Sequence, residues 1–467
     1  MPSASFDNGH RWLGLILALL CSGLLCYSQA TTLDWDEGFH LVAARLVAAG
    51  QRPYIDFCLP QPSLHTWWNA LWLNVTGGGW RGPHLIAALL TGAAVVLTAD
   101  YVARRFSPVA ACAAALLVGL NAVVVQFGTT AQAYGVGTFL TVAAFRATVA
   151  RPAILLAALA GCLAGAAAGC SLLTAPVCLV LFVWHAWYRP RTHTAAYVAG
   201  VVLVWLPLLF SFFEAPYQTW FNLAGYHLFY RHSGWEATTR NDLRVLFSWA
   251  TSGPALLIAL LTIAGLRYSR THRPELVLAV ILAGALAAEA APAHPTFHQY
   301  FIFLTPFLAI PAAVGFREAA ARLSLPIRWA LPALAGVLIV ALSSSLIEMR
   351  DSNNTWTSMD LLATKIRQVT PVGGLVLADP PVYFALRQAP PSGMEFPASH
   401  MLELTRDQAA LLHIVPQSVL AGRVRAGEFA TVETCKGDEE DIAALELPRL
   451  YAHSATFSGC DVYWGFR

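Results

Sequence analysis

Charged residues are scarce in this chain of 467 residues, where Asp, Glu, Lys and Arg together make up 12% of the sequence. A soluble domain carries about 25% charged residues. Half of that amount cannot cover the surface of a soluble chain this long, which excludes an ordinary cytosolic enzyme, a disordered protein and a nucleic-acid binder. The hydrophobic content of 57% and the mean hydropathy of +0.55 indicate a polytopic membrane protein instead.

Apolar runs of about 20 residues, the length that crosses a bilayer, predict about eleven membrane spans. These runs cover residues 12–30, 84–103, 108–126, 132–149, 153–170, 171–187, 194–213, 245–266, 275–291, 299–316 and 328–347. With Arg11 in the cytoplasm, the cytoplasmic side receives thirteen arginines and the outside receives six before the tail. This excess favours a cytoplasmic N-terminus. The first run is also compatible with a signal peptide that ends at Ala30, and the first loop is external in either case.

Acidic residues divide the chain, because fifteen of the 27 Asp and Glu lie from Glu348 onward. We therefore predict a transmembrane domain over 1–347 and a small extracytoplasmic α/β domain over 348–467. In this tail, residues 374–378 are predicted as a buried strand followed by a turn at 379–381, and residues 405–414 as a helix. Cys435 and Cys460 both lie in the tail, where an oxidising compartment allows a disulfide or leaves two thiols. No Cys or His spacing indicates a structural zinc site.

The first external loop, residues 31–83, holds four of the twelve remaining acids: Asp34, Asp36, Glu37 and Asp56. Apolar residues from Phe39 to Val47 recur with helical spacing. We predict a surface helix that Asp34 or Asp36 caps at its start and that Gly50 ends. A second short helix, rich in tryptophan, is predicted to begin at Pro62.

Asp36 and Glu37 have two interpretations. Both can be helix caps on a solvated face, stabilised by the helix dipole. Alternatively they form a site, because ionised acids are costly near a membrane and these four cluster in one loop. The dipole then keeps the carboxylate charged and able to accept a proton or bind a cation.

The loop resembles the GT-C superfamily of membrane glycosyltransferases, in particular the dolichyl-phosphate-mannose–protein mannosyltransferase and lipid A arabinosyltransferase-like group. The resemblance rests on the Asp-Glu pair after the first span and on a Gly-x-x-Pro-Tyr-x-Asp pattern. Further similar stretches cover roughly the first 320 residues. The residues concerned are Gly50, Pro53, Tyr54, Asp56, Pro60 and Pro62, the segment 131–134, the small-residue run 161–174, and 297–301 with Pro306.

The resemblance implies transfer of a sugar from a polyprenyl-phosphate-linked donor to an acceptor hydroxyl outside the membrane. Asp36 would be the general base and Glu37 would assist it or organise the acceptor. Donor and acceptor contacts are assigned to Asp34, Arg52, Tyr54, Asp56, Arg231, His298 and Tyr300. His232, Arg240 and His294 are further external candidates for stabilising the leaving phosphate. The implied setting is a bacterial inner membrane, with a lipid-linked donor, an acceptor glycan, lipid or protein, and no nucleic acid.

Some features depart from this pattern. The second external loop, around 126–132, carries no acid, so a divalent metal would rest on Asp36 and Glu37, with Asp34 as a third ligand. No cytoplasmic Asp-x-Asp motif indicates a nucleotide-sugar donor. The loop from Glu214 to Asp242 is rich in aromatic and basic residues and is either a lid or an anchored surface loop. A secondary transporter and a non-catalytic assembly protein remain alternative functions; the external position of the acids argues against transport.

Overall fold

The computed structural model describes residues 3–30, 32–231, 239–269, 272–293, 295–348, 355–402, 404–435 and 445–467. The chain divides into two compact units. Unit 1 draws on residues 1–30, 83–207 and 237–349, and unit 2 on residues 31–82, 208–236 and 350–467. Unit 2 therefore joins the first loop, the 208–236 segment and the tail, which the sequence-based division at 347/348 assigned to two domains.

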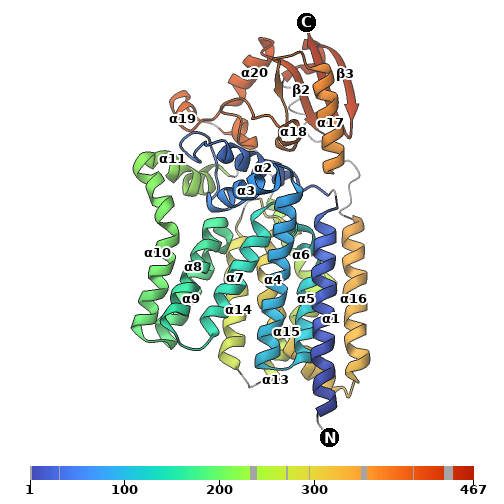
Figure 1. Cartoon of the computed structure of the whole chain (residues 1–467). Helices are drawn as coiled ribbons and strands as arrows, with labels where there is room; N and C mark the ends of the chain where they lie inside the picture. Colours follow the sequence, from blue (N-terminus) through green and yellow to red (C-terminus); the bar gives the residue numbers. More distant parts are fainter. Residues whose placement is uncertain are drawn as a thin grey trace. The chain divides into compact units, whose positions relative to one another are not determined.

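Unit 1 is a bundle of apolar helices that run side by side (Figure 1). Its helices match the predicted apolar runs closely, because each run is long enough to satisfy its backbone only as a helix in lipid. They are α1 (Ser3–Ser28), α4 (Arg81–Arg105), α5 (Pro108–Gly119), α6 (Ala122–Phe127), α7 (Ala133–Val149), α8 (Ile154–Cys170), η1 (Leu172–Thr174), α9 (Ala175–Tyr188), α10 (Arg191–Glu214), α12 (Thr239–Thr251), α13 (Gly253–Tyr268), α14 (Arg273–Ala290), η3 (His298–Leu304), α15 (Thr305–Arg322) and α16 (Ile327–Glu348).

Among the described residues, five helical segments are long and apolar enough to cross a membrane: Gly9–Ser28, Arg81–Arg105, Arg191–Glu214, His298–Arg322 and Ile327–Glu348. Helices α12 and α13 form a further candidate span that bends by 59° at its break. Four shorter apolar segments, among them α7 and α8, account for other predicted runs. The protein is thus a multi-pass membrane protein, and the count of eleven spans stays a prediction.

Small residues allow the closest helix contacts of unit 1. A Cβ at Gly315 of α15 would lie 1.8 Å from the Leu261 carbonyl oxygen of α13, and one at Gly265 would lie 2.1 Å from the Pro311 carbonyl oxygen. Each glycine thus lets the backbone of the other helix come close. In a membrane, where the hydrophobic effect does not drive helices together, such close packing at small residues stabilises their association.

Arginines that were predicted to be cytoplasmic gather at one end of this unit. Arg146 lies 2.6 Å from the Asp100 carboxylate, and Arg105 and Arg189 donate to carbonyl groups at the C-terminal end of α7. Tyr101 donates to Glu275 at 2.5 Å, which joins α4 to the start of α14. The basic residues therefore satisfy the exposed carbonyls of a helix end, where positive charge is favoured.

Unit 2 contains α2 (Trp35–Ala48), α3 (Leu64–Thr76), α11 (Pro216–Trp220), the π-helix η2 (Phe221–Tyr230), α17 (Trp356–Val369), α18 (Pro380–Leu386), η4 (Pro397–Met401), α19 (Arg406–Leu411), α20 (Gln417–Arg425) and α22 (Leu447–Leu450). Its strands are β1 (Leu375–Leu377), β2 (Phe429–Cys435), β3 (Tyr451–Phe457) and β4 (Cys460–Phe466). They form one sheet in the order β1-β2-β4-β3, with β1 parallel to β2 and the other pairs antiparallel.

The predicted strand in the tail is confirmed as β1. Cys435 and Cys460, for which the sequence left a disulfide and two thiols open, form a disulfide between β2 and β4. The predicted turn at 379–381 is wrong, because Asp379 is the N-cap residue of α18 and the two prolines occupy its first turn, where their missing N–H groups cost nothing. The predicted helix over 405–414 is shorter and ends at Leu411. Thr405 and Gln408 form its capping box.

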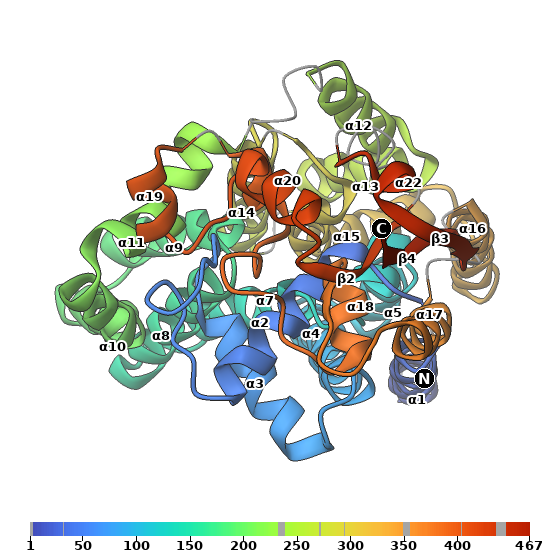
Figure 2. The ribbon, with the colours of Figure 1, turned by 90° about the horizontal axis from the view of Figure 1, so that it is seen from above.

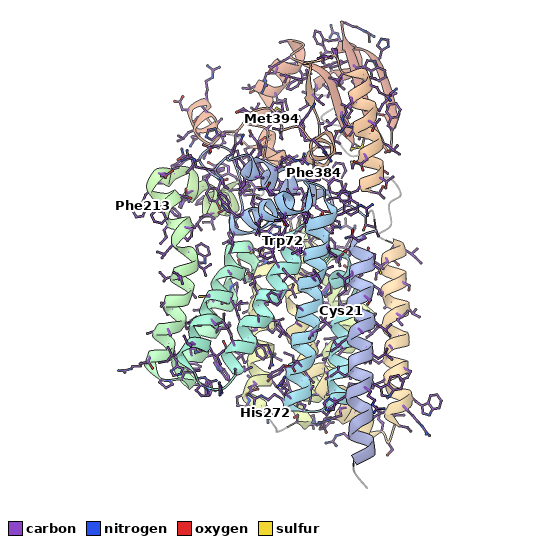
Figure 3. All side chains as sticks on the ribbon, viewed as in Figure 1. Cys21, Trp72, Phe213, His272, Phe384 and Met394 are labelled. Atoms are coloured by element: carbon purple, nitrogen blue, oxygen red, sulfur yellow. A yellow bond between two sulfur atoms is a disulfide. The ribbon has the colours of Figure 1, made fainter. Side chains whose placement is uncertain are left out.

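Helix α2 has the predicted limits but different surroundings. Asp34 caps it, and Gly50 follows its end with φ +93°. Ten of its 14 residues are buried, whereas the sequence predicted a helix lying on the membrane surface. Helix α3 begins at Leu64 rather than Pro62 and exposes Trp67 and Leu71 along one side. Figure 3 labels Trp72 on the same helix.

Helix α18 of the tail covers α2 (Figure 2). A Cβ at Gly38 would lie 2.4 Å from the Pro381 nitrogen, so the two backbones approach as closely as glycine permits. About two turns further along α2, Arg45 donates to the Phe384 carbonyl at 2.9 Å and stacks on the Phe384 ring at 4.0 Å. A hydrophobic periodicity cannot reveal this second covering layer, because it comes from a segment more than 330 residues away.

The Gly38 contact yields a stability prediction. Gly38→Ala places a methyl group against the Pro381 ring and should lower the free energy of unfolding by about 1–3 kcal/mol through overpacking. Thermal unfolding of the purified protein in detergent measures the change. Gly422→Ala on α20 is the matched control, since a Cβ there meets nothing within 4 Å and alanine favours a helix. Equal midpoints for the two variants would contradict the packing.

Candidate functional site

The start of α2 orients its three acids differently. The Asp34 side chain accepts the Asp36 N–H at 3.2 Å, so this carboxylate is used as the helix cap. Asp36 follows in the first turn with an exposed side chain, whereas Glu37 is 0% exposed. Successive residues on a helix point about 100° apart, which is why one carboxylate reaches solvent and the next is enclosed.

Arg231 acts electrostatically on Asp36. Desolvation by the surrounding protein raises the pKa of Asp36, and the positive charge of Arg231 opposes that rise. The sequence-based expectation was that the helix dipole alone keeps this acid ionised. Here its charge depends on a balance between burial and a neighbouring arginine. The predicted pair Asp36 and Arg231 is thus brought together, although 195 positions separate them in the sequence.

Arg52, Tyr54 and Asp56 shape the turn after α2. Arg52 pairs with Asp56 and donates to Glu214 at 2.9 Å, at the end of α10. Tyr54 is buried at a φ of +71°, and its hydroxyl donates to the Gln61 carbonyl at 2.7 Å. These contacts make the three residues supports of the loop. Their predicted contacts with donor or acceptor remain predictions.

The segment between Glu214 and Arg231, predicted as a lid or a surface loop, is mostly helical and is tied to the first loop. The buried Asn222 side chain of η2 accepts the Leu59 N–H at 2.8 Å and lies 3.3 Å from the Cys58 thiol. His227 interacts with the Pro60 backbone, and burial lowers its pKa to about 4, with the Arg231 charge adding to the effect. These contacts hold the end of η2, and hence Arg231, over the first loop.

His298 and Tyr300 belong to unit 1. His298 Nε2 lies 3.0 Å from the Ser248 hydroxyl, and Tyr300 is buried with its ring edge-on to Phe297. The structure does not bring these two predicted residues into the unit that holds Asp36, and their role stays a prediction. Arg240 is an exposed residue on α12. His232 and His294 lie outside the described residues.

The sequence analysis missed a buried polar group beside the acids. His40 lies one helical turn after Asp36, its ring packs edge-on against His65 at 5.4 Å, and His65 Nε2 lies 3.1 Å from the Asn69 amide nitrogen. Burial lowers the pKa of His40 to about 3, with His65 as the second cause. The sequence did contain a sign of this group: Asp36 and His40, and likewise His65 and Asn69, are four residues apart, which places each pair on one face of a helix.

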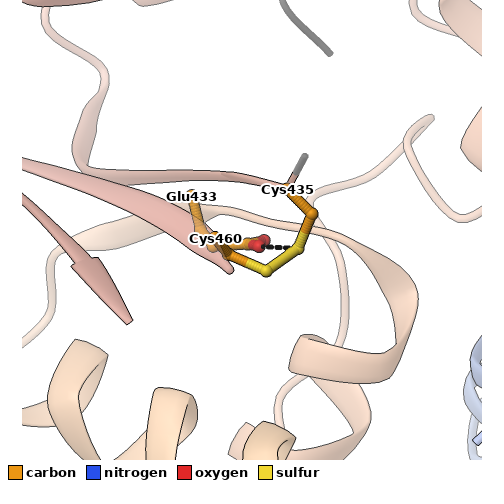
Figure 4. A group of neighbouring side chains, drawn as sticks. All are labelled: Glu433, Cys435 and Cys460. Carbon is orange, nitrogen blue, oxygen red and sulfur yellow. Dashed lines mark hydrogen bonds between the residues drawn. A yellow bond between two sulfur atoms is a disulfide. The ribbon is translucent and has the colours of Figure 1, made fainter. Parts of the chain in front are cut away.

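The described residues include no group of three close potential metal ligands that contains Asp36 or Glu37. Among them, one group of three potential ligands lies close together: Glu433, Cys435 and Cys460. Both cysteines are in the disulfide, and Glu433 Oε1 lies 2.8 Å from Cys435 Sγ (Figure 4). A bonded sulfur is not a thiolate ligand. The group at the disulfide therefore does not fit a divalent ion, and no step below uses a metal.

Solved structures share this architecture. ArnT from Cupriavidus metallidurans bound to undecaprenyl phosphate matches with a TM-score of 0.68 at 17% identity, covering 97% of this chain and 98% of that one. The chain has the GT-C fold. The oligosaccharyltransferase of Archaeoglobus fulgidus matches with a TM-score of 0.58 at 11% identity, over 93% of this chain and 71% of that one. No protein-family model and no curated protein matches the sequence.

Buried His40 predicts a pH-dependent stability. The unfolded chain protonates His40 near pH 6.5, whereas the folded protein keeps it neutral down to about pH 3. Stability should therefore fall as the pH drops below about 6.5, by up to about 1.4 kcal/mol per pH unit for this residue. Unfolding midpoints between pH 7.5 and 5 measure the slope.

His40→Asn should make that slope shallower, because the variant has one proton fewer to bind on unfolding. His453→Asn, at an exposed position on β3, serves as the control and should leave the slope unchanged. A His40→Asn protein with lower stability but an unaltered slope would show that His40 contributes only packing.

Proposed function

We propose that the chain is a glycosyltransferase that moves a sugar from a polyprenyl-phosphate-linked donor to an acceptor hydroxyl on the extracytoplasmic side of the membrane. One observation carries the proposal: a helix presents an exposed Asp36 beside a fully buried Glu37, with the charge of Arg231 acting on the exposed acid. A carboxylate whose pKa is raised toward the working pH is the form that general-base catalysis needs.

In the proposed step, Asp36 takes the proton of the acceptor hydroxyl while the oxygen of that hydroxyl attacks the anomeric carbon. The bond from that carbon to the phosphate oxygen breaks, and its electron pair leaves with the polyprenyl phosphate. In this step Arg231 would stabilise the developing phosphate charge. Glu37 is enclosed and acts as a positioning residue for the first turn of α2.

The two carboxylates favour a single displacement. A double displacement needs a nucleophile and a separate acid that flank the sugar from opposite sides, about 5 Å apart. Asp36 and Glu37 are neighbours on one helix and one of them is buried, so they cannot flank a sugar ring. One displacement inverts the configuration of the anomeric carbon, which is the stereochemical outcome we propose.

The lipid donor is supported by two observations. ArnT, which has the same fold, is bound to undecaprenyl phosphate, and the Archaeoglobus fulgidus enzyme has been solved with dolichol-phosphate. In this chain, helices such as α10 and α16 expose large apolar side chains along most of their length. Such helices suit an enzyme whose donor arrives through the lipid. The predicted threading places the N-terminus in the cytoplasm and Asp36 outside.

Asp36→Asn tests the base. Sugar transfer should fall by a factor of about 10²–10⁴, the usual contribution of general-base catalysis, because the amide cannot accept the proton. The assay incubates purified protein with a panel of polyprenyl-phosphate sugars and follows donor consumption by mass spectrometry.

Asp360→Asn supplies the matched control, since this acid lies on α17 of the same unit and takes no part in the proposed step. Full transfer by the Asp36→Asn protein would remove Asp36 from the mechanism. If the unmodified chain consumed no donor in the panel, the assembly-protein alternative would gain support.

Arg231→Gln tests the charge balance at Asp36. Without the positive charge, the pKa of Asp36 should rise further, since Arg231 opposes the effect of burial. The acid limb of the kcat/KM profile should therefore move to higher pH, and Arg231→Lys should keep it near its original position. A loss of rate with an unshifted acid limb would show that Arg231 contacts the phosphate without tuning the base.

A further inference from the structure

Positive charge exceeds negative charge in one stretch of unit 1. Between Asp100 and Glu214 the sequence contains six arginines and no acid. Three of these arginines pair with Asp100 or with Glu275 of α14. The other three form no ion pair within the part of the chain that the structure describes: Arg151, Arg189 and Arg191.

These three arginines lie at two neighbouring turns at one end of unit 1, between α7 and α8 and between α9 and α10 (Figure 1). Arg189 donates to the Thr148 carbonyl at 2.9 Å and to the Ala150 carbonyl at 3.0 Å, which ties the two turns together. Arg151 and Arg191 are exposed. We call this region, defined by the three arginines, the basic turn surface.

Buried polar atoms without a hydrogen-bond partner among the described residues concentrate beside the basic turn surface. They lie on the last turns of α7 and α9 and on the first turn of α10, and they belong to Thr148, Trp184, His185, His193 and Thr194. His185 contributes both of its ring nitrogens. Because folded proteins pair nearly all of their buried polar groups, this concentration indicates that water or a bound ligand completes the hydrogen bonds.

The His185 ring is directed toward the basic turn surface. Its side chain is 2% exposed and its ring stacks on Tyr197 at 5.0 Å. Arg189 and His193 both lie near enough to act on the ring electrostatically. A neutral imidazole carries one N–H donor and one acceptor, so a polar group that reaches this ring can form two further hydrogen bonds.

The chemistry of these groups favours an anion. Indole, hydroxyl and guanidinium groups all donate hydrogen bonds. Helix α10, which is 24 residues long, begins at Arg191 and adds the positive end of its dipole. Arginine forks match the oxygens of a phosphate group. Basic pockets between the ends of membrane helices are known to bind phosphate-bearing headgroups.

We propose that the basic turn surface is a binding site for a phosphate group, carried by an anionic phospholipid headgroup or supplied as free phosphate. The site is independent of the proposed sugar transfer, because none of its residues takes part in that step. The predicted threading places these turns on the cytoplasmic side, whereas it places Asp36 outside.

Lipid binding to the purified, delipidated full chain in detergent tests the proposal. The probes are phosphatidylglycerol, phosphatidylcholine and inorganic phosphate, and bound lipid is measured by native mass spectrometry and by titration. Phosphatidylglycerol should bind at least tenfold more tightly than phosphatidylcholine, whose ammonium group offsets its phosphate charge. Arg191→Gln should weaken this binding by about fivefold, the effect of one basic residue near an anionic headgroup. Thr194→Val, which keeps the side-chain shape, should weaken it by about fivefold to tenfold.

The phosphate titration distinguishes the two sources of the group. Binding of inorganic phosphate that both variants weaken, without a preference for phosphatidylglycerol, would identify free phosphate as the ligand. Arg267→Gln is the matched control, because it removes an exposed arginine at the end of α13 on the same predicted side, and it should leave the affinities unchanged. An equal loss in Arg267→Gln and Arg191→Gln, affinities that neither site variant changes, or no binding of phosphatidylglycerol and phosphate would each overturn the proposal.

Discussion

The packing of α18 against α2 determines where the acids of the first loop lie. Gly38 leaves no space between its own backbone and the Pro381 ring, and Arg45 fixes the same two helices about two turns later. With α3 on another side, most of α2 is enclosed, and Asp36 near its start is the exposed position. The exposure of Asp36 and the burial of Glu37 both follow from this enclosure, since a helix covered on several sides exposes only its end.

The charge state of Asp36 depends on segments that are distant from it in the sequence. The protein around Asp36 disfavours its ionised form and raises its pKa, and the positive charge of Arg231 opposes that rise. Arg231 is positioned because Asn222 and His227 attach η2 to residues 58–60 of the first loop. The amide of Asn222 therefore matters to the proposed chemistry although it contacts only backbone and a thiol. The site is an assembly of three segments, and each one supplies either the acid, the cation or the enclosure.

Local sequence signals predicted the elements well and their partners poorly. The apolar runs, the start of α2 at the first acids and its end at Gly50 depend on nearby residues, and the structure contains all of them. The choice of Asp34 over Asp36 as the cap and the pairing of Cys435 with Cys460 were left open by the sequence and are decided by the structure. The burial of α2 depends on contacts with a remote segment, the tail. The role of Asp379 depends on a local choice between a turn and a helix cap. The pairing of Arg52 with Asp56 was also not predicted. The periodicity of α2 indicated one apolar face correctly, but nothing in it indicates that the tail covers the other.

An exposed base creates a problem of selectivity that the tail can solve. Water is also able to lose a proton to Asp36, and transfer to water would waste the lipid-linked sugar. Binding energy from a part of the acceptor that does not react is what gives the acceptor hydroxyl its advantage over water. The tail packs on α2 through α18 and through the edge-on contact of Phe396 with Phe39, so an acceptor that contacted the tail would be positioned by the same packing that positions Asp36. On this argument the tail sets which acceptor is used, while the first loop supplies a chemistry that does not depend on the acceptor.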